Sequence, residues 1–571
     1  MKLLLYLLLT VVFPVTCTGL DREAFSFTNY DLEARVEQSQ QRLAVRGKVT
    51  LRNDSSAPQR NVSLQISSTL AWRSIQSAGK PLQFVSQPYT SDVDHTGAVS
   101  EAIVTLPQQV PARGTIQLDL GYEGTIPPDA TRLTRIGVPE ADARHSDWDQ
   151  IGESYTAVRG MGYVLWYPVA TESANLSEGS TVFEAVGRWQ RREQSSEMHV
   201  NLCVENSEAQ TVFMNDSAGD VKASHNASGD SCQQHDFAPL GPRAPLFVIG
   251  KYQFLNRQRA DIYYRPENKS AAEDYALAAE LAEPFVRDWF GATSRKVRVV
   301  ELNDPEAAPF ESGTLLLAPL SIAGDSRLAQ MTAVHQLSHA AFASTRLWMG
   351  EGLAHFAQAA YREQQSGRQA ALDFMGLHRS AVAQAEKSVA EEHQAASAAE
   401  QSLINTSLQE FYRSKAMYVW WMLRDMVGDP ALRKSLAAYA PSEDKDPAYM
   451  QRLIESASKR DLEWFFDDWV YRDKGLPDFR VAAAVPRAIL NGGYIVTVTV
   501  ENLGNAGAEV PVRLFGDIGE VTKRLQVPAK GRASIRIEIP SSPERVQIND
   551  GSVPESDLTN NSLNVSLPAP Q

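Results

Sequence analysis

Two histidines and one glutamate have the types and the spacing of a metal site. His335 and His339 lie four residues apart in a segment of helical periodicity, so both imidazoles project from one helix face. Glu351 follows twelve residues later, in LWMGEGLAHF at the start of the next helical pattern. Two histidines from one helix and a carboxylate from its neighbour can hold a zinc ion that keeps its fourth position open. The sequence therefore predicts Zn²⁺ bound by His335, His339 and Glu351.

The alternative is a metal-free scaffold in which these histidines merely pack. The chain has ten histidines, and a pair at this spacing arises by chance in about one such chain in six. The carboxylate behind Trp348, at the start of a second apolar helix, favours a metal. His355 lies four residues after Glu351 and either supports a ligand or packs, while Trp420 and Trp421 are core or pocket wall.

The elements that position these residues follow from the hydrophobic periodicity. Residues 25–253 alternate in short runs, such as TIQLDLGY and EMHVNLCVEN, which are typical of an all-β sandwich or saddle-like sheet. Helical patterns dominate residues 328–474, with a solvated or covering helix near residues 384–401, and period-two runs return after residue 476. We expect a multidomain α+β protein with a β domain (residues 20–255), a mainly helical α+β domain (256–475) and an immunoglobulin-like β-sandwich with a polar tail (476–571).

Composition and charge limit the compartment and the partners. The net charge of -14 argues against nucleic acid as a partner, because phosphate binding needs a basic surface. Residues 1–19 read as a signal peptide, so we expect export to the periplasm or the cell exterior; an uncleaved membrane anchor is the minority alternative, and no later segment reads as transmembrane. Cys203 and Cys232 then remain, as a disulfide or as two free thiols. The sequence carries no signal for an oligomeric state.

HQLSH followed by WMGEGLAHF resembles the HExxH and (N/S)EG(F/L)A motifs of the gluzincin metallopeptidases, especially the aminopeptidase N and leukotriene hydrolase family. The order of regions, with FFDDWVYRDKGLPDF before the last one, is similar as well, so the resemblance covers essentially the whole exported chain. It implies a thermolysin-like domain at residues 256–475, the same three zinc ligands, and a peptide or protein as substrate or ligand.

Gln336 is the main departure from the family motif, because it stands where the family has its catalytic glutamate. That glutamate takes a proton from the attacking water and passes it to the leaving amine, a contribution worth about 10²–10⁴ in rate. An amide can hydrogen-bond the water but cannot accept its proton. The resemblance therefore predicts bound zinc more strongly than peptide cleavage.

Two further candidates come from the resemblance. Glu311, in PFESGTLLL, matches the glutamate of the family's GxMEN strand, which holds the free amine of the substrate, although the Gly, Met and Asn are replaced. The family's oxyanion-stabilising tyrosine is replaced by Arg413. Tyr412 comes one residue too early, so it is a candidate only if the helix is rotated or irregular; Tyr418 is the second candidate, and aromatic packing is the alternative for both.

The sequence thus predicts an exported, zinc-binding metallopeptidase-like protein whose hydrolysis of peptide bonds is impaired by Gln336. Its candidate catalytic residues are Gln336, Tyr412 and Glu311. The alternative is an inactive pseudopeptidase that serves as a peptide- or protein-binding module. Whether the chain is an enzyme stays open at this point.

Overall fold

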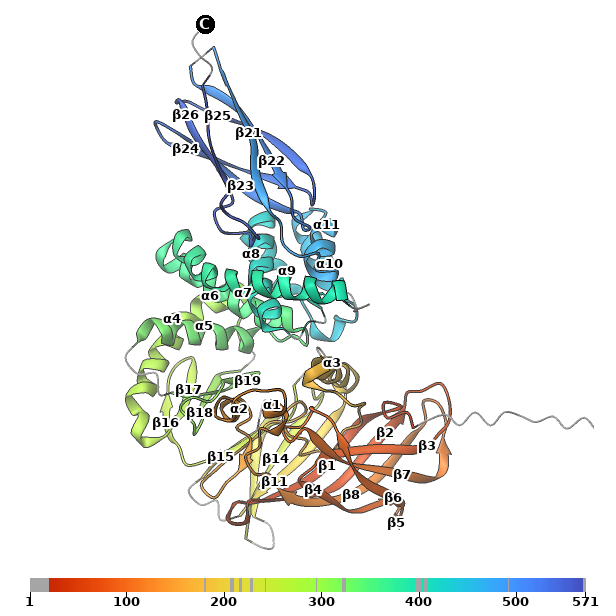
Figure 1. Cartoon of the computed structure of the whole chain (residues 1–571). Coiled ribbons are helices and arrows are strands. Elements are labelled where there is room, and N and C mark those ends of the chain that lie inside the picture. Colours follow the sequence, from red (N-terminus) through yellow and green to blue (C-terminus); the bar gives the residue numbers. More distant parts are fainter. Residues whose placement is uncertain are drawn as a thin grey trace, which may run out of the picture.

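The computed structural model shows three regions that follow one another along the chain, a β-rich N-terminal region, a mainly helical middle region and a C-terminal pair of β-sheets (Figure 1). The predicted signal peptide, residues 1–19, lies outside the described residues. The structure describes residues 20–178, 181–205, 210–214, 218–225, 229–241, 243–293, 295–320, 325–395, 402–404, 406, 408–490 and 492–567.

The N-terminal region is built on a large sheet in which β1 pairs antiparallel with β2 and parallel with β11. Its strand order is β13 (Ala218–His225), β14 (Ser231–Phe237), β11 (Glu197–Val204), β1 (Phe25–Glu37), β2 (Arg42–Asn53), β8 (Thr115–Thr125), β4 (Leu70–Ser77) and β5 (Lys80–Pro81). Two smaller sheets have the orders β3 (Gln59–Ser67), β7 (Ala98–Val110), β6 (Gln83–Thr90), and β12 (Thr211–Met214), β15 (Phe247–Gly250), β10 (Tyr155–Val158), β9 (Gln150–Ile151). The alternating residues predicted to share a face are buried, as Leu118, Leu120 and Tyr122 of β8 illustrate.

The N-terminal region is β-rich, but its described residues also include three α-helices that the alternating pattern did not predict. These are α1 (Thr131–Arg135), α2 (Glu140–Ser146) and α3 (Thr181–Glu193). Helix α3 lies on the side of this region that faces the helical middle region (Figure 1). The sulfurs of Cys203 and Cys232 are joined in a disulfide between β11 and β14.

The middle region begins with a mixed sheet covered by helices. Strand β17 (Ala260–Tyr264) is followed by the 22-residue helix α4 (Lys269–Phe290) and then by the parallel strand β18 (Val297–Glu301), a βαβ unit. The sheet is completed by β16 (Gln253–Asn256), β20 (Leu315–Ala318) and, at the edge beyond β20, β19 (Phe310–Ser312).

The remaining helices of the middle region pack on one another and on α4 around a single apolar core. They are α5 (Ser326–Ala341), α6 (Leu347–Ser366), α7 (Arg368–Ala395), α8 (Ala416–Val427), α9 (Asp429–Ala438), α10 (Tyr449–Ser458) and α11 (Glu463–Phe466), with π-helical turns η4 (Glu410–Lys415) and η6 (Asp467–Tyr471). The helix expected near residue 384 is the second half of α7; residues 396–401 of that expectation lie outside the described residues.

The C-terminal region consists of two antiparallel sheets that share one buried interior. One has the order β21 (Phe479–Ala488), β22 (Tyr494–Asn502), β25 (Arg532–Ile539), and the other β24 (Glu520–Val527), β23 (Ala508–Gly516), β26 (Pro543–Ile548), β27 (Ser562–Asn564). Among the described residues, no helix is long and apolar enough to cross a membrane.

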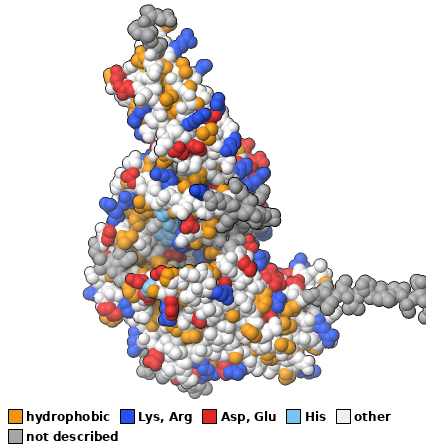
Figure 2. Space-filling view, in the orientation of Figure 1, with side chains coloured by type: hydrophobic (Ala, Val, Ile, Leu, Met, Phe, Trp, Pro, Cys, Tyr) orange, Lys and Arg blue, Asp and Glu red, His pale blue; other side chains and the backbone are white. Residues whose placement is uncertain are grey.

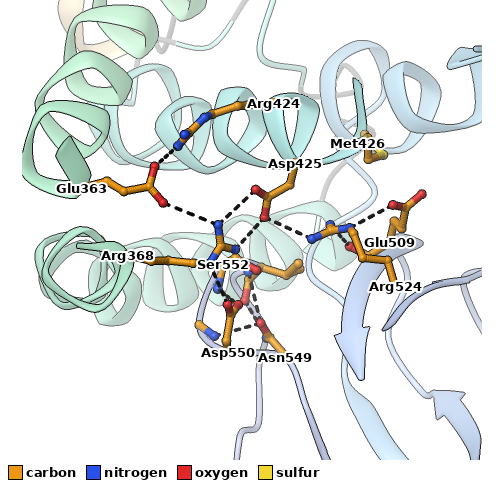
Figure 3. Close-up of polar contacts among 12 residues, drawn as sticks. Glu363, Arg368, Arg424, Asp425, Met426, Glu509, Arg524, Asn549, Asp550 and Ser552 are labelled. Atoms are coloured by element: carbon orange, nitrogen blue, oxygen red, sulfur yellow. Dashed lines mark hydrogen bonds and ion pairs between the residues drawn. The ribbon is translucent and has the colours of Figure 1, made fainter. Parts of the chain in front are cut away.

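A network of charged side chains joins the C-terminal sheets to the helices (Figure 3). Arg368 at the start of α7 donates to Asp425 of α8 and to Asp550, which follows β26. Arg524 of β24 donates to the same Asp425 at 3.1 Å and to Glu509 of β23 at 2.9 Å. Because each carboxylate is shared or paired, the two regions are connected by a set of coupled ion pairs rather than by one exposed pair.

Candidate metal centre

Helix α5 presents the two histidines because its ends and its buried face are well defined. The Asp325 side chain accepts hydrogen bonds from the backbone N–H groups of Arg327 and Leu328, which caps the first turn. The helix ends at Ala341, where Phe342 adopts an extended conformation. The helix is packed between α4 and α6, with Val334 and Leu337 in the core.

Glu351 reaches the histidines because the connection between α5 and α6 is short and anchored. Arg346, the residue before α6, forms an ion pair with the buried Asp444 at 2.6 Å. The rings of Trp348 and Trp420 are stacked with centroids 5.0 Å apart, and the Trp420 indole N–H donates to the Trp348 carbonyl. These contacts fix the first turns of α6 against α8, and Glu351 with them.

Gly352 allows this close approach of α6 to α8. A Cβ at this position would meet the Ala416 Cβ at 2.6 Å and the Trp420 ring at 3.2 Å. Real Cβ atoms do not approach a fixed neighbour that closely, so only glycine fits without moving the helices apart.

The structure brings the three predicted ligands together. Their ligand atoms all lie within 4.8 Å of one another, with His339 Nε2 3.4 Å and His335 Nε2 3.9 Å from the oxygens of Glu351. Two atoms bound tetrahedrally about 2.0–2.1 Å from one zinc ion lie about 3.3 Å apart. The distances are close to that value, and the buried His339 Nε2 makes no well-aligned hydrogen bond among the described residues, its neighbour at 3.4 Å being the Glu351 oxygen with which it would share the ion.

The charge states of these residues also suit a cation. Burial, reinforced by the neighbouring His339, lowers the pKa of His335 well below its usual value, so this imidazole is neutral and can act as a ligand. Burial alone would lower the pKa of His339, but the Glu351 carboxylate outweighs it and raises that pKa. Burial would raise the pKa of Glu351, yet His339 holds it well below its usual value, so Glu351 is ionised.

Arg413 has a role in the site that its position in the motif did not predict. Its Nε donates to Glu351 Oε2 at 2.9 Å, while the other oxygen of Glu351 faces His339. The guanidinium thus orients the carboxylate and places a positive charge next to the predicted metal position. The sequence identified Arg413 only as a replacement for tyrosine.

Tyr412 lies in an irregular helix, the condition under which the sequence made it a candidate for stabilising the oxyanion. Residues 410–415 form the π-helical turn η4, which changes the angular position of each side chain relative to an α-helix. The Tyr412 ring packs against Phe183 of α3 at a centroid distance of 6.1 Å. Burial raises the pKa of Tyr412; the charge of Arg413 opposes this rise, and the Glu351 carboxylate reinforces it. The Arg413 guanidinium, which donates to Glu351, lies 5.6 Å from the centroid of the Tyr412 ring, so Tyr412 lies beside the cluster.

Tyr418, the second tyrosine candidate, lies elsewhere. Its side chain is fully buried, and its hydroxyl donates to the Met375 carbonyl of α7 at 2.7 Å. This tyrosine belongs to the packing between α7 and α8, which was the alternative interpretation. Trp348, Trp420 and Trp421 are fully buried core residues.

Gln336 is buried beside the cluster with its amide held by Tyr275. The side chain is 1% exposed, and the Tyr275 hydroxyl of α4 donates to Gln336 Oε1. Glu311 lies nearby in β19; burial raises the pKa of its carboxyl, while His339 and the Gln336 amide favour its charged form. Tyr275 is 61 residues from Gln336 in the chain, and no motif pointed to it.

His355 packs against the site. Its ring meets that of His335 edge to face at 5.1 Å, and burial lowers its pKa to about 4, so it is neutral. On its other side, the ring of His378 lies 5.8 Å away. His355 is thus packed against His335, one of the predicted ligands.

The N-terminal region contributes to the surroundings of Glu311. The ring of Tyr163 meets that of Phe310, the neighbour of Glu311, edge to face at 5.3 Å. The guanidinium of Arg159 stacks on Tyr163, 3.6 Å from its ring centroid, and lies 5.3 Å from the centroid of the Phe310 ring. Figure 2 shows a hollow between this region and the helices above it, with histidine side chains visible in it.

Comparisons with known proteins identify the fold. No model of a protein family matches the sequence, and no curated protein matches it either. Among solved structures, the M1 zinc metallopeptidase from Deinococcus radiodurans is similar with a TM-score of 0.51 at 16% identity, over 78% of this chain and 94% of that one. Legionella pneumophila aminopeptidase A, solved in complex with aspartic acid, is similar with a TM-score of 0.65 at 12% identity, over 93% of this chain and 59% of that one.

This chain therefore has the multidomain fold of the M1, aminopeptidase N-like zinc metallopeptidases, as the motif resemblance predicted. It spans about three fifths of the length of the Legionella enzyme. At these identities the likeness establishes the fold alone, so the chemistry must be argued from the residues of this chain.

Proposed function

We propose that this protein is an exported, zinc-binding metallopeptidase-like protein that takes peptides in its metal centre and whose hydrolytic step is impaired by Gln336. One observation carries the proposal. Three side chains with the spacing and charge states of zinc ligands converge between α5 and α6 in a chain that has the M1 fold, and the residue beside two of them is an amide. Export is inferred from residues 1–19 of the sequence.

Each residue of the site has a role in this proposal. Zinc, when bound, supplies a Lewis acid that polarises a carbonyl and activates water as a nucleophile. His335, His339 and Glu351 hold the ion, and Arg413 orients the Glu351 carboxylate. Glu311 offers a carboxylate for the amine of a peptide, and Tyr412 offers a hydroxyl near the carbonyl oxygen, where negative charge develops.

Proton transfer is the step that these residues do not supply. Gln336 has no ionisable oxygen, and its carbonyl oxygen already accepts the hydroxyl of Tyr275. This contact favours the second candidate function, a pseudopeptidase that binds peptides without cleaving them. Glu311 is the carboxylate positioned to replace the missing base in the first candidate.

Metal content and peptidase activity test the proposal together. We expect one zinc per chain in the wild type and none in His335→Ala, measured by inductively coupled plasma mass spectrometry. We also expect Gln336→Glu to raise turnover of quenched fluorescent peptides by about 10²-fold or more, the usual effect of a general base. A wild type that cleaves peptides rapidly, with Gln336→Glu no faster, would contradict the role given to Gln336.

Gln330→Glu is a matched control for this experiment. Gln330 lies on the same helix, and its Oε1 also accepts the hydroxyl of a tyrosine, Tyr361, at 2.9 Å. It is not part of the cluster of ligand atoms. The same chemical change there is expected to leave turnover unchanged, so a rise in both variants would point to a general charge effect.

A further inference from the structure

The unusual feature of this site is a buried amide group with its N–H donors unused. Burial, reinforced by the Glu311 carboxylate, raises the pKa of Tyr275, so its hydroxyl keeps its proton and donates to Gln336 Oε1. The oxygen and nitrogen of an amide point about 120° apart, so Nε2 is directed away from Tyr275. Among the residues that the structure describes, Nε2 makes no hydrogen bond of ordinary length, although the side chain is 1% exposed; the carboxyl of Glu311 is the nearby acceptor whose charged form the amide favours.

An unsatisfied buried donor is unfavourable, and folded proteins rarely keep one without a reason. The Gln336 amide lies next to His335 in the chain and close enough to Glu311 to influence its charge. The donor is thus held beside the three metal ligands. A ligand that binds there and carries an acceptor oxygen would satisfy it.

The charges around the site favour an anionic oxygen. Arg413 adds one positive charge at Glu351, and a divalent ion adds two, so the sum stays positive against the negative charges of Glu351 and Glu311. A glutamate at position 336 would lower this sum and repel an anion. A glutamine leaves the sum unchanged and supplies a hydrogen-bond donor instead.

We propose that the metal centre binds the carboxylate group of an amino acid or short peptide, with the N–H of Gln336 donating to one carboxylate oxygen. The inference rests on the proposed function, because it needs the metal in place. It gives the site a ligand class, carboxylates rather than scissile amides, and it gives Gln336 a binding role in place of the lost catalytic one. Tyr275 is a positioning residue that fixes the direction of the donor.

Calorimetric titration of the zinc-loaded protein with L-leucine and L-leucinamide tests the inference, since the two probes differ only in carboxylate against carboxamide. We expect the wild type to prefer leucine, and Gln336→Met, which keeps the side-chain length but has no donor, to bind leucine about 10-fold or more weakly, the usual effect of losing a hydrogen bond to a charged group. Gln336→Glu should weaken leucine binding further, because the two carboxylates repel each other. The affinity for leucinamide should change little in either variant. A parallel titration with acetate shows whether a carboxylate alone is enough for binding or whether the amine is needed as well. Weaker acetate binding by Gln336→Met than by the wild type would by itself support the inference.

Equal affinity for leucine in wild type, Gln336→Met and Gln336→Glu would overturn the inference. Gln330→Met serves as the control on the same helix and should bind both probes as the wild type does. Tyr275→Phe leaves the Gln336 amide in place but no longer fixes its orientation, so it should weaken leucine binding less than Gln336→Met does. A loss of leucine affinity as large as that of Gln336→Met would argue that the amide donor is not the contact. Zinc content is measured on the same samples. If no zinc is bound, the proposed function is refuted. If zinc is bound but leucine affinity does not depend on residue 336, only the carboxylate inference is refuted.

Discussion

Gly350 and Gly352 flank Glu351 on α6, and replacing each by alanine should have opposite effects. A Cβ at residue 352 would lie 2.6 Å from the Ala416 Cβ, whereas carbon atoms in contact are about 3.5–4.0 Å apart. Helix α6 must therefore move by about 1 Å from α8 in Gly352→Ala. Zinc sites tolerate displacements of about 0.2 Å in their ligand distances, so Glu351 should leave the coordination distance.

The expected outcome for Gly352→Ala is a zinc affinity at least about 10-fold weaker and a loss of stability of about 1–3 kcal/mol from overpacking. Gly350→Ala is the matched control, because its Cβ would meet only the His339 Cε1 at 3.9 Å and a carbonyl at 4.0 Å, which are ordinary contacts. Alanine is favoured over glycine inside a helix by about 1 kcal/mol, so this variant should keep zinc and unfold at a higher temperature. Competition with a chromogenic chelator gives the affinities, and thermal unfolding with and without zinc gives the stabilities. Wild-type zinc affinity in Gly352→Ala would refute the claim that this glycine sets the position of Glu351.

Two further predictions concern protonation and a buried charge. The pKa of His339 is raised while those of His335 and Glu351 are lowered, so zinc binding should displace one proton, from His339. The affinity of the protein for zinc should therefore rise about tenfold per pH unit from the usual histidine range up to the raised pKa of His339, and then level off. In the metal-free protein the raised pKa of His339 stabilises the fold below the ordinary histidine pKa, and this stabilisation is lost as the pH rises through the raised value. Calorimetry of zinc binding in buffers of different ionisation enthalpy counts the released protons. Two released protons would contradict the assignment. Lys415→Met should destabilise the protein by about 3–5 kcal/mol, because fully buried Lys415 pairs with Glu386 and with a second carboxylate. The loss should be smaller at pH 5 than at pH 8 in urea unfolding, since burial already raises the pKa of Glu386 and protonation removes the unpaired charge; equal losses at both pH values would argue against a charge effect.

The sequence predicted the fold well where one periodicity ran long enough to be unambiguous. The two-residue period of β8 and β22 and the helical period of α5 and α6 are strong signals, because each buries one face. Helices α1 and α2 are only five and seven residues long, too short for a helical period to stand out between strands. The N-terminal region therefore reads as all-β although it is only β-rich.

The site was predictable to the extent that it is local in the chain. His335 and His339 share a helix, and Glu351 follows within one short connection, so spacing alone placed them together. Tyr275 and Phe183 contact the site from α4 and α3, through tertiary packing that no local pattern encodes. Tyr412 needed knowledge of the π-helical turn, because a shift in hydrogen-bond register within one helix has no clear signature in a single sequence.

Two departures from the resembled motifs, at positions 336 and 413, change the charge of the site in the same direction. Glutamine in place of glutamate at position 336 removes one negative charge, and arginine in place of tyrosine at position 413 adds one positive charge. A random loss of activity needs only the first change and gives no reason for Arg413 to be held by Glu351 at 2.9 Å. Both changes together favour binding of an anion over removal of a proton, since each stabilises negative charge at the open position and neither supplies a base. Reversing only position 336 should therefore restore a base beside a guanidinium that still favours anions, so we expect Gln336→Glu to regain turnover but to remain strongly inhibited by carboxylate products.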